Sequence, residues 1–329
     1  MPDQFNVLLE VRNVRKFFGV RGKSVLPTAK YVQAVNEVNF SVRRGEVFSV
    51  VGESGSGKTT LGQMLIRLLD PSDGEIMFDG VDLMTLDDQQ MRRARKRMQI
   101  IFQDPYSSLN PYMTVGDAIG EVLEVHGITK TTAERDQRVD DLLETVGLRS
   151  ATSVRYPHEF SGGQRQRIAI ARAIAANPEF LVADEPVSAL DVSVQAQILN
   201  LISDLRASMG LTMVFISHDL AVVRHIADRV AVMYLGRIME IADVDEFFDR
   251  PLHPYSQALL SAVPTPDIRR SKQRQVLSGE IASPMSPPSG CVFRTRCPHA
   301  IEACAGVVPP LELKSATRSS ACIRDDLLK

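Results

Sequence analysis

Apolar residues alternate with polar ones in two early segments of the chain and then run together in a third. The alternation lies in VLLEVRNV (7–14) and YVQAVNEVNFSV (31–42), and the continuous run lies in EVFSVVG (46–52). Alternation is typical of strands with one buried face, whereas a short continuous run indicates a strand buried on both faces. We therefore predict three strands, the last of which enters a glycine-rich loop.

Helical spacing follows that loop. The segment TLGQMLIRLLD (60–70) predicts a helix whose apolar face carries Leu61, Met64, Leu65, Leu68 and Leu69. The turn residues 70–74 then lead into short strands around EIMFDG (75–80).

Two later apolar runs, FLVADEP (180–186) and MVFISHD (213–219), flank a predicted helix. This strand–helix–strand order predicts a parallel sheet, and therefore an α/β fold. Residues 104–176 differ in character and predict a mostly helical subdomain. No internal repeat of 20 to 50 residues occurs, which disfavours a solenoid.

Composition places the chain among ordinary globular proteins. Its 329 residues are 44% hydrophobic and 24% charged, with a formal net charge of -2, so no basic field points to nucleic acid. No signal peptide or uninterrupted apolar stretch of membrane-spanning length is present, and we expect a cytoplasmic chain that does not span the membrane.

Beyond residue 264 the sequence becomes rich in Pro, Ser and Gly, which predicts a boundary near 265–285 between domains 1–264 and 265–329.

The strongest motif is GESGSGKT (52–59), which matches the G-x-x-x-x-G-K-[ST] phosphate loop between a predicted strand and a predicted helix. A chance glycine turn is the alternative, and the strand and helix context disfavours it. Backbone amides would face the phosphates, Lys58 would supply a cation, and the Thr59 hydroxyl would ligate Mg²⁺. The candidate nucleotide-binding residues of this loop are Gly52, Ser54, Gly55, Ser56, Gly57, Lys58, Thr59 and Thr60.

A second glycine turn, in HEFSGGQRQRIAIARA (158–173), opens another predicted helix. Ser161 can cap that helix, and its N-terminal amides with bare glycines form a potential anion site. The chain therefore carries two phosphate cradles, which requires an explanation.

Polar residues follow three apolar runs. Asp184 would hold Mg²⁺ through water, and Glu185 would orient a water for attack on the γ-phosphate, although such a pair alone is more often a solvated strand end. His218 can donate to the γ-phosphate, although a lone histidine is usually structural. Gln103 can coordinate Mg²⁺ or water without adding charge, but in isolation it is an ordinary loop residue.

Together these pieces resemble the ATP-binding cassette (ABC) family of ATPases. The matching text is GESGSGKT, IIFQDP, FSGGQ, FLVADEP, SALD and ISHD, in family order over about residues 5–250. The resemblance implies a RecA-like parallel core, an antiparallel β subdomain and an α-helical subdomain. It also implies a head-to-tail dimer, in which Ser161, Gly162, Gly163 and Gln164 complete the partner's ATP site and Asp191 lies at the seam. Each of the two cradles would then serve a different nucleotide.

The same resemblance assigns an aromatic residue to stack on adenine. Phe18 matches it, although the adjacent Phe17 leaves the register open and a strand aromatic in the core is the alternative. The FSGGQ signature begins with Phe160 where Leu is commoner, an apolar exchange that leaves the phosphate contacts in place.

Further text, including FQDPYSSLNPYMTVGDAI, PLHPYSQALLSAVP and PPSGCVFRTRCPHA, is similar to the ATPase subunits of bacterial dipeptide and oligopeptide importers. This resemblance implies a peripheral ATPase at the cytoplasmic face of the inner membrane. Its partners would be a second, related ATPase subunit in a heterodimer, two permeases and, indirectly, an extracytoplasmic peptide-binding protein. We expect residues 104–120 to contribute to the surface that receives a permease helix, since they follow Gln103.

Two alternatives remain. The same importer class also carries glutathione or nickel chelates, and selectivity lies in other subunits. A soluble, non-transport cassette ATPase of DNA repair or translation would use the same chemistry, but it commonly has tandem cassettes, coiled-coil insertions or zinc modules that this sequence lacks.

All four cysteines, Cys291, Cys297, Cys304 and Cys322, lie in the last forty residues with the spacing C-x5-C-x6-C-x17-C. A cytoplasmic location favours ligation over disulfides, and the spacing is not that of a zinc ribbon. The subfamily resemblance favours a structural 4Fe-4S cluster, with zinc or free thiols as alternatives. Because this segment has little apolar material of its own, we expect the ligation to hold it.

Overall fold

The computed structural model describes residues 6–20, 30–262, 277, 279–280 and 282–328. It divides into two compact units, of which the first comprises Met1–Val42, Val47–Met84 and Ser217–Lys329 and the second Arg43–Glu46 and Thr85–Ile216. The boundary expected at 265–285 lies largely outside the described residues. Each unit is described by itself.

The first unit contains an antiparallel four-stranded sheet of order β2-β1-β4-β5. Its strands are β1 (Val7–Val20), β2 (Lys30–Arg43), β4 (Asp73–Phe78) and β5 (Val81–Asp82). Leu9 of β1 lies opposite Phe78 of β4, and both side chains are buried. The alternation in the first two segments therefore predicted the strands and their buried face correctly.

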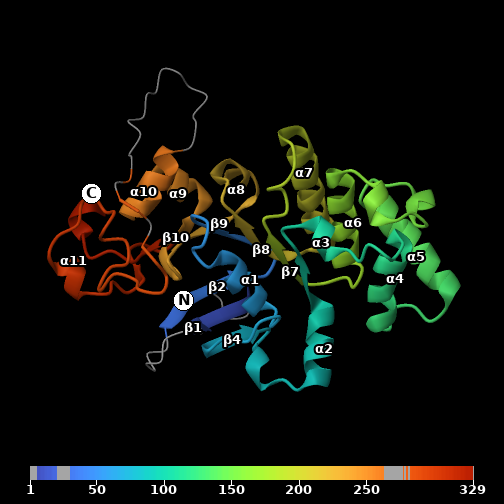
Figure 1. Cartoon of the computed structure of the whole chain (residues 1–329), viewed down its shortest axis with the longest axis horizontal. Helices are drawn as coiled ribbons and strands as arrows, with labels where there is room; N and C mark the ends of the chain where they lie inside the picture. Colours follow the sequence, from blue (N-terminus) through green and yellow to red (C-terminus); the bar gives the residue numbers. More distant parts are fainter. Residues whose placement is uncertain (1–5, 21–29, 263–276, 278, 281, 329) are drawn as a thin grey trace. The chain divides into compact units, whose positions relative to one another are not determined.

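A second set of strands in this unit runs in the order β3-β9-β10-β12-β11, with β3 parallel to β9 and the later neighbours antiparallel. Figure 1 shows the neighbouring strands β9 and β10. These strands are β3 (Val47–Val51), β9 (Arg229–Tyr234), β10 (Arg237–Asp243), β11 (Glu312–Leu313) and β12 (Ser319–Ser320). The helices of this unit are α1 (Lys58–Leu65), η2 (Leu83–Thr85), α8 (Leu220–Ile226), α9 (Val244–Asp249), α10 (Pro254–Ser261), α11 (Ala303–Gly306) and η5 (Asp325–Leu328).

Helix α1 is shorter than its apolar pattern predicts. It ends at Leu65, because Arg67 adopts a φ of 51° and the Leu68 amide donates to the Gln63 carbonyl. The prediction that Leu68 and Leu69 continue the helical face is wrong, and Leu68 is 48% exposed. A residue with positive φ closes the helix in the way that glycine usually does.

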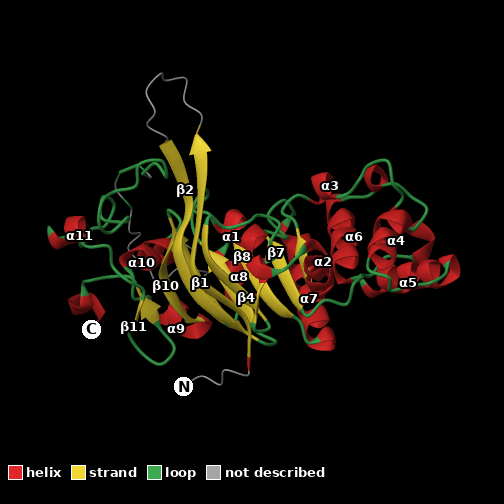
Figure 2. Ribbon diagram, turned by 90° about the horizontal axis from the view of Figure 1, so that it is seen from below, coloured by secondary structure: helices red, strands yellow, loops and turns green. Residues whose placement is uncertain are grey.

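The second unit combines three parallel strands with helices, as the strand–helix–strand pattern predicts. Strands β6 (Met98–Ile101), β7 (Phe180–Asp184) and β8 (Thr212–Ser217) lie in that order, and every residue of β7 and β8 is buried. The helices are α2 (Asp88–Arg97), α3 (Pro105–Ser108), α4 (Val115–Val125), α5 (Thr132–Thr145), η3 (Ser150–Thr152), η4 (Pro157–Glu159), α6 (Gly162–Ile174) and α7 (Val192–Met209). Helices α4, α5 and α6 pack against one another (Figure 2). Between 104 and 176 the described elements are all helical, as expected.

The cysteine-containing segment is held by packing, which the sequence interpretation did not anticipate. Phe293 is fully buried, with its ring centroid 5.4 Å from that of Tyr234 and 5.2 Å from that of Tyr255. Cys291, Val292 and Cys304 belong to the same apolar cluster. Strand β12 also pairs with β10, so this segment shares the core of the first unit and does not depend on ligation alone for its order.

Candidate nucleotide site

The phosphate loop connects β3 to α1 in a backbone conformation that only glycine permits. Gly57 has a φ of 103°, and a Cβ atom there would lie 2.0 Å from the Ala34 carbonyl oxygen. A Cβ atom at Gly52 would lie 2.1 Å from the Met233 carbonyl oxygen. The two motif glycines are therefore required by close backbone packing as well as by phosphate access.

Lys58 spans this loop from the first turn of α1. Its Nζ donates to the carbonyl oxygens of Gly52, at 2.9 Å, and of Glu53, at 3.0 Å, and the residue is only 5% exposed. The lysine therefore ties the start of the loop to the first turn of the helix that follows it. Thr59 is exposed at the start of α1, and the buried hydroxyl of Ser56 has no hydrogen-bond partner among the described residues. These features fit a bound polyphosphate with Mg²⁺.

Two further candidates of the first unit are exposed. Phe18 lies near the end of β1 with 39% of its surface exposed, and the Lys16 Nζ lies 5.3 Å from its ring centroid. Phe17 is less exposed. His218 follows β8 directly and is exposed. Phe18 is therefore the aromatic residue more available for stacking.

In the second unit, the structure brings Gln103 and Glu185 together. They follow the neighbouring parallel strands β6 and β7, and the Gln103 Nε2 donates to the Glu185 carboxylate at 3.0 Å. Asp184, the last residue of β7, is 3% exposed. Parallel strands deliver their following residues to one edge, which explains why the sequence pattern found this group.

Glu185 leaves β7 in a strained conformation. Its φ is 45°, and its amide donates to the Ile216 carbonyl at 3.0 Å, so the backbone turns sharply after Asp184. A non-glycine residue in this region costs of the order of 1–3 kcal/mol and is frequent at functional sites. The turn gives Glu185 a trajectory distinct from that of Asp184.

The second glycine turn forms the N-terminus of α6. Ser161 accepts from the Gln164 amide at 3.3 Å, and the Gln164 side chain accepts from the Ser161 amide at 3.0 Å, a reciprocal capping box. Ser161 and Gly162 are exposed, while a Cβ atom at Gly163 would lie 2.5 Å from Val194 of α7. Glycine is thus needed at this position for helix packing.

Asp191 precedes α7 and makes no capping hydrogen bond with its side chain. The following Val192 is 82% exposed.

The sequence analysis missed a group that surrounds Glu53. The Arg296 guanidinium pairs with the Glu53 carboxylate at 2.7 and 3.2 Å, and the Tyr255 hydroxyl accepts from the Glu53 amide at 3.0 Å. Glu53 and Arg296 are 243 residues apart, and no local spacing could have revealed the pair.

The four cysteines lie close enough to affect one another electrostatically, and none forms a disulfide. Burial raises the pKa of Cys291 to about 11, and the other three thiols contribute smaller effects in the same direction. The Cys291 amide donates to the Cys304 carbonyl at 2.9 Å. However, no three His, Cys, Asp or Glu side chains among the described residues form a group that could hold a metal ion.

Comparisons with known proteins agree with this geometry. The family model described as ABC transporter matches residues 35–188, and the model for the oligopeptide/dipeptide transporter C-terminal region matches residues 239–304. A putative peptide import ATP-binding protein of Brucella ovis is 55% identical over 320 residues, covering 97% of this chain and 98% of the relative. The oligopeptide transport ATP-binding protein AppF of Bacillus subtilis is 50% identical over 318 residues, covering 96% of each chain.

Solved structures give the same result. The dimeric ATP-binding cassette MJ0796 bound to ADP and Pi has a TM-score of 0.64 and 29% identity, covering 72% of this chain and 99% of that chain. The protein cbiO1 of Clostridium perfringens has a TM-score of 0.62 and 27% identity, covering 74% and 92%.

The chain therefore belongs to the ATP-binding cassette ATPases, and the α/β cassette fold expected from the sequence is confirmed. Within that family it is a member of the peptide-importer group. None of the helices in the described part of the chain is long and apolar enough to cross a membrane.

We predict that Glu185→Gln retains ATP binding but slows hydrolysis by roughly 10² or more, because a neutral amide cannot accept a proton from the attacking water. Mixed with a partner ATPase subunit, the variant should accumulate as an ATP-bound dimer, detectable by size-exclusion chromatography with ATP. Glu144→Gln, on the exposed face of α5, is the matched control and should behave as the unmodified chain. Normal turnover by Glu185→Gln would contradict the assignment.

Proposed function

We propose that this chain is the ATP-hydrolysing motor subunit of an importer for dipeptides and oligopeptides. The observation that carries the proposal is the phosphate loop, in which the buried Lys58 side chain donates to two backbone carbonyl oxygens of a glycine turn. The identity to peptide import ATPases over nearly the whole chain supports the choice of importer. It also favours peptides over glutathione or nickel chelates as the solute, and transport over DNA repair or translation.

In this proposal, each candidate residue has a chemical role toward ATP. Lys58 and the loop amides bind the β- and γ-phosphates, while Thr59, Asp184 and Gln103 hold Mg²⁺ directly or through water. The bound metal ion offsets phosphate charge.

Glu185 orients the attacking water and accepts its proton, and His218 donates to the γ-phosphate. Phe18 stacks on adenine. The hydrogen bond from Gln103 to Glu185 supports a common role for that pair.

Hydrolysis requires a second cassette in this proposal. The exposed Ser161 and Gly162 at the N-terminus of α6 form an anion site that would complete the ATP site of the partner. Asp191 and exposed Val192 would contribute to the seam. A related ATPase subunit is the proposed partner, which makes the pair a heterodimer at the cytoplasmic face of the inner membrane.

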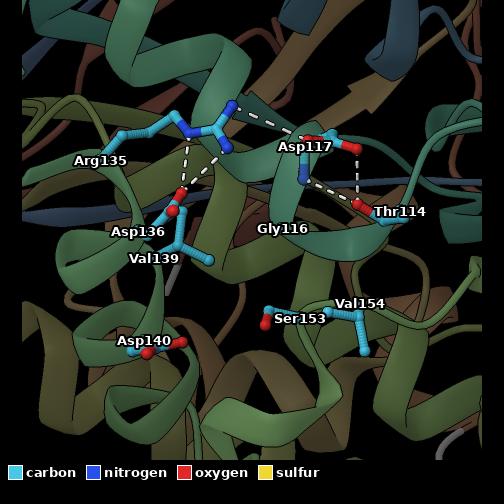
Figure 3. A pocket seen from close by; sticks show the side chains of 9 residues that line it. All are labelled: Thr114, Gly116, Asp117, Arg135, Asp136, Val139, Asp140, Ser153 and Val154. Carbon is cyan, nitrogen blue, oxygen red and sulfur yellow. Dashed lines mark hydrogen bonds and ion pairs between the residues drawn. The ribbon is translucent and has the colours of Figure 1, made fainter. Parts of the chain in front are cut away.

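The permease surface is proposed to include residues 104–120. Tyr106 and Tyr112 of this segment are 59% and 89% exposed, and the segment follows Gln103 directly. At the start of α4, Thr114 and Asp117 line a pocket of about 350 Å³ together with Asp136 and Asp140 of α5 (Figure 3). Arg135 pairs with Asp136 at 2.9 Å and with Asp117 at 3.7 Å. The pocket is lined by more carboxylates than guanidinium groups. This charge balance suits a docking segment that carries a basic residue.

We also propose a structural 4Fe-4S cluster on Cys291, Cys297, Cys304 and Cys322. The number and type of ligands support it, since four thiolates complete such a cluster, whereas zinc is the alternative. Among the described residues the four cysteines do not form a group that could hold a metal ion, so the proposal rests on the number and type of the ligands. Their burial also requires thiolate formation to be driven by the metal, because burial raises the pKa values of Cys291 and Cys297.

For the permease surface, we predict that a photoreactive benzoylphenylalanine at Tyr112 crosslinks to a permease in the assembled importer. Tyr112 is almost fully exposed in the segment that follows Gln103, so its side chain can reach a docked helix. The same photoreactive residue at Leu313, which is 70% exposed in the first unit, is the control and should not crosslink. Crosslinking from position 313 but not from 112 would refute the placement.

For the cluster, we predict that anaerobically purified protein is brown and absorbs near 400 nm, roughly the thiolate-to-iron charge-transfer region. Cys291→Ser or Cys322→Ser should remove this absorbance. Because Phe293 anchors the segment independently, these variants should remain folded. Colourless protein that contains stoichiometric zinc, or no metal, would exclude the cluster.

A further inference from the structure

The second residue of the phosphate loop is acidic, which is unfavourable where a polyphosphate binds. Glu53 follows Gly52 directly, and 24% of its side chain is exposed. An uncompensated carboxylate near the phosphates would repel them through several charge pairs. The loop therefore needs a group that either removes this charge or directs it away from the nucleotide.

Arg296 supplies that group from the cysteine-containing segment. Its Nη1 lies 2.7 Å from Glu53 Oε2 and its Nη2 lies 3.2 Å from Oε1, a two-point ion pair. The Arg296 side chain is 8% exposed, so water screens the pair weakly. Paired in this way, the carboxylate and guanidinium together carry no net charge, and the carboxylate is directed toward the C-terminal segment.

The backbone of Glu53 is fastened at the same time. Its amide donates to the Tyr255 hydroxyl at 3.0 Å, and its carbonyl accepts from the Lys58 Nζ at 3.0 Å. Tyr255 is fully buried in α10. The amide, the carbonyl and the side chain of one loop residue are therefore each held by a different part of the first unit.

Arg296 is in turn positioned by buried aromatic residues. Its guanidinium carbon lies 5.9 Å from the Tyr234 ring centroid, and its own amide donates to the Phe293 carbonyl at 3.0 Å. Phe293 packs against both Tyr234 and Tyr255. Packing against buried aromatic residues thus holds the guanidinium in position next to the loop.

We propose that Arg296 is a positioning residue of the nucleotide site, which orients Glu53 and cancels its charge so that the phosphate loop can bind a nucleotide. The C-terminal segment then contributes to ATP binding as well as to the fold. This inference rests on the proposed ATPase function.

The test is the affinity of the full chain for Mg-ADP, measured by titration calorimetry. Arg296→Gln should weaken binding about tenfold, because the charge of Glu53 is then uncompensated. Glu53→Gln should bind within about twofold of the unmodified chain or more tightly, since it removes the repulsion. The double variant Glu53→Gln with Arg296→Gln should recover most of the affinity.

This recovery distinguishes charge compensation from a purely structural role of the ion pair. If the ion pair only held the loop in place, both single variants and the double variant would lack it, and all three would bind Mg-ADP equally weakly. Arg294→Gln is the matched control, since Arg294 lies two positions away and donates to Ser289 instead of the loop. Arg296→Lys retains the charge but not the two-point geometry, so its affinity for Mg-ADP should lie between those of Arg296→Gln and the unmodified chain. Thermal unfolding verifies that each variant is folded.

Unchanged affinity of Arg296→Gln, or a double variant as weak as Arg296→Gln, would overturn the proposal for Arg296. A failure of the ATPase function itself gives a different pattern, in which the unmodified chain and Lys58→Ala bind Mg-ADP equally weakly.

Discussion

The nucleotide site depends on one buried lysine that holds its own loop. Lys58 donates to two carbonyl oxygens at the start of the phosphate loop, and two glycines allow the loop to pass within contact distance of neighbouring backbone. A buried ammonium is stable only with such partners. The same charge that organises the loop also provides the attraction for phosphate, so loop structure and ligand binding have a common cause.

Strain and burial separate the roles of the two acidic residues that follow β7. Asp184 ends a fully buried strand and remains in it, whereas Glu185 turns into a left-handed conformation and meets Gln103. Two adjacent carboxylates would otherwise be chemically similar. The backbone turn provides the difference, because it brings the Glu185 carboxylate to Gln103, the second residue after β6.

The sequence predicted those features that depend on local pattern. Alternation identified β1 and β2, continuous apolar runs identified β3, β7 and β8, and the motif glycines identified the turns that open α1 and α6. Features that depend on distant packing were missed. The positive φ of Arg67 shortens α1 in a way that helical spacing does not indicate. The ion pair of Arg296 with Glu53 joins residues that are 243 positions apart, and Phe293 packs against Tyr234 and Tyr255 from other elements, which periodicity cannot detect.

In the proposed function, ATP bound at the Lys58 loop drives peptide import. The most direct test is ATP-dependent uptake of a labelled peptide into vesicles that contain the complete importer, with either the unmodified chain or Lys58→Ala. The account predicts uptake with the unmodified chain and a loss of about 10²-fold or more with Lys58→Ala, because the cation that stabilises the transferring phosphate is absent. Equal uptake with both chains would contradict the account.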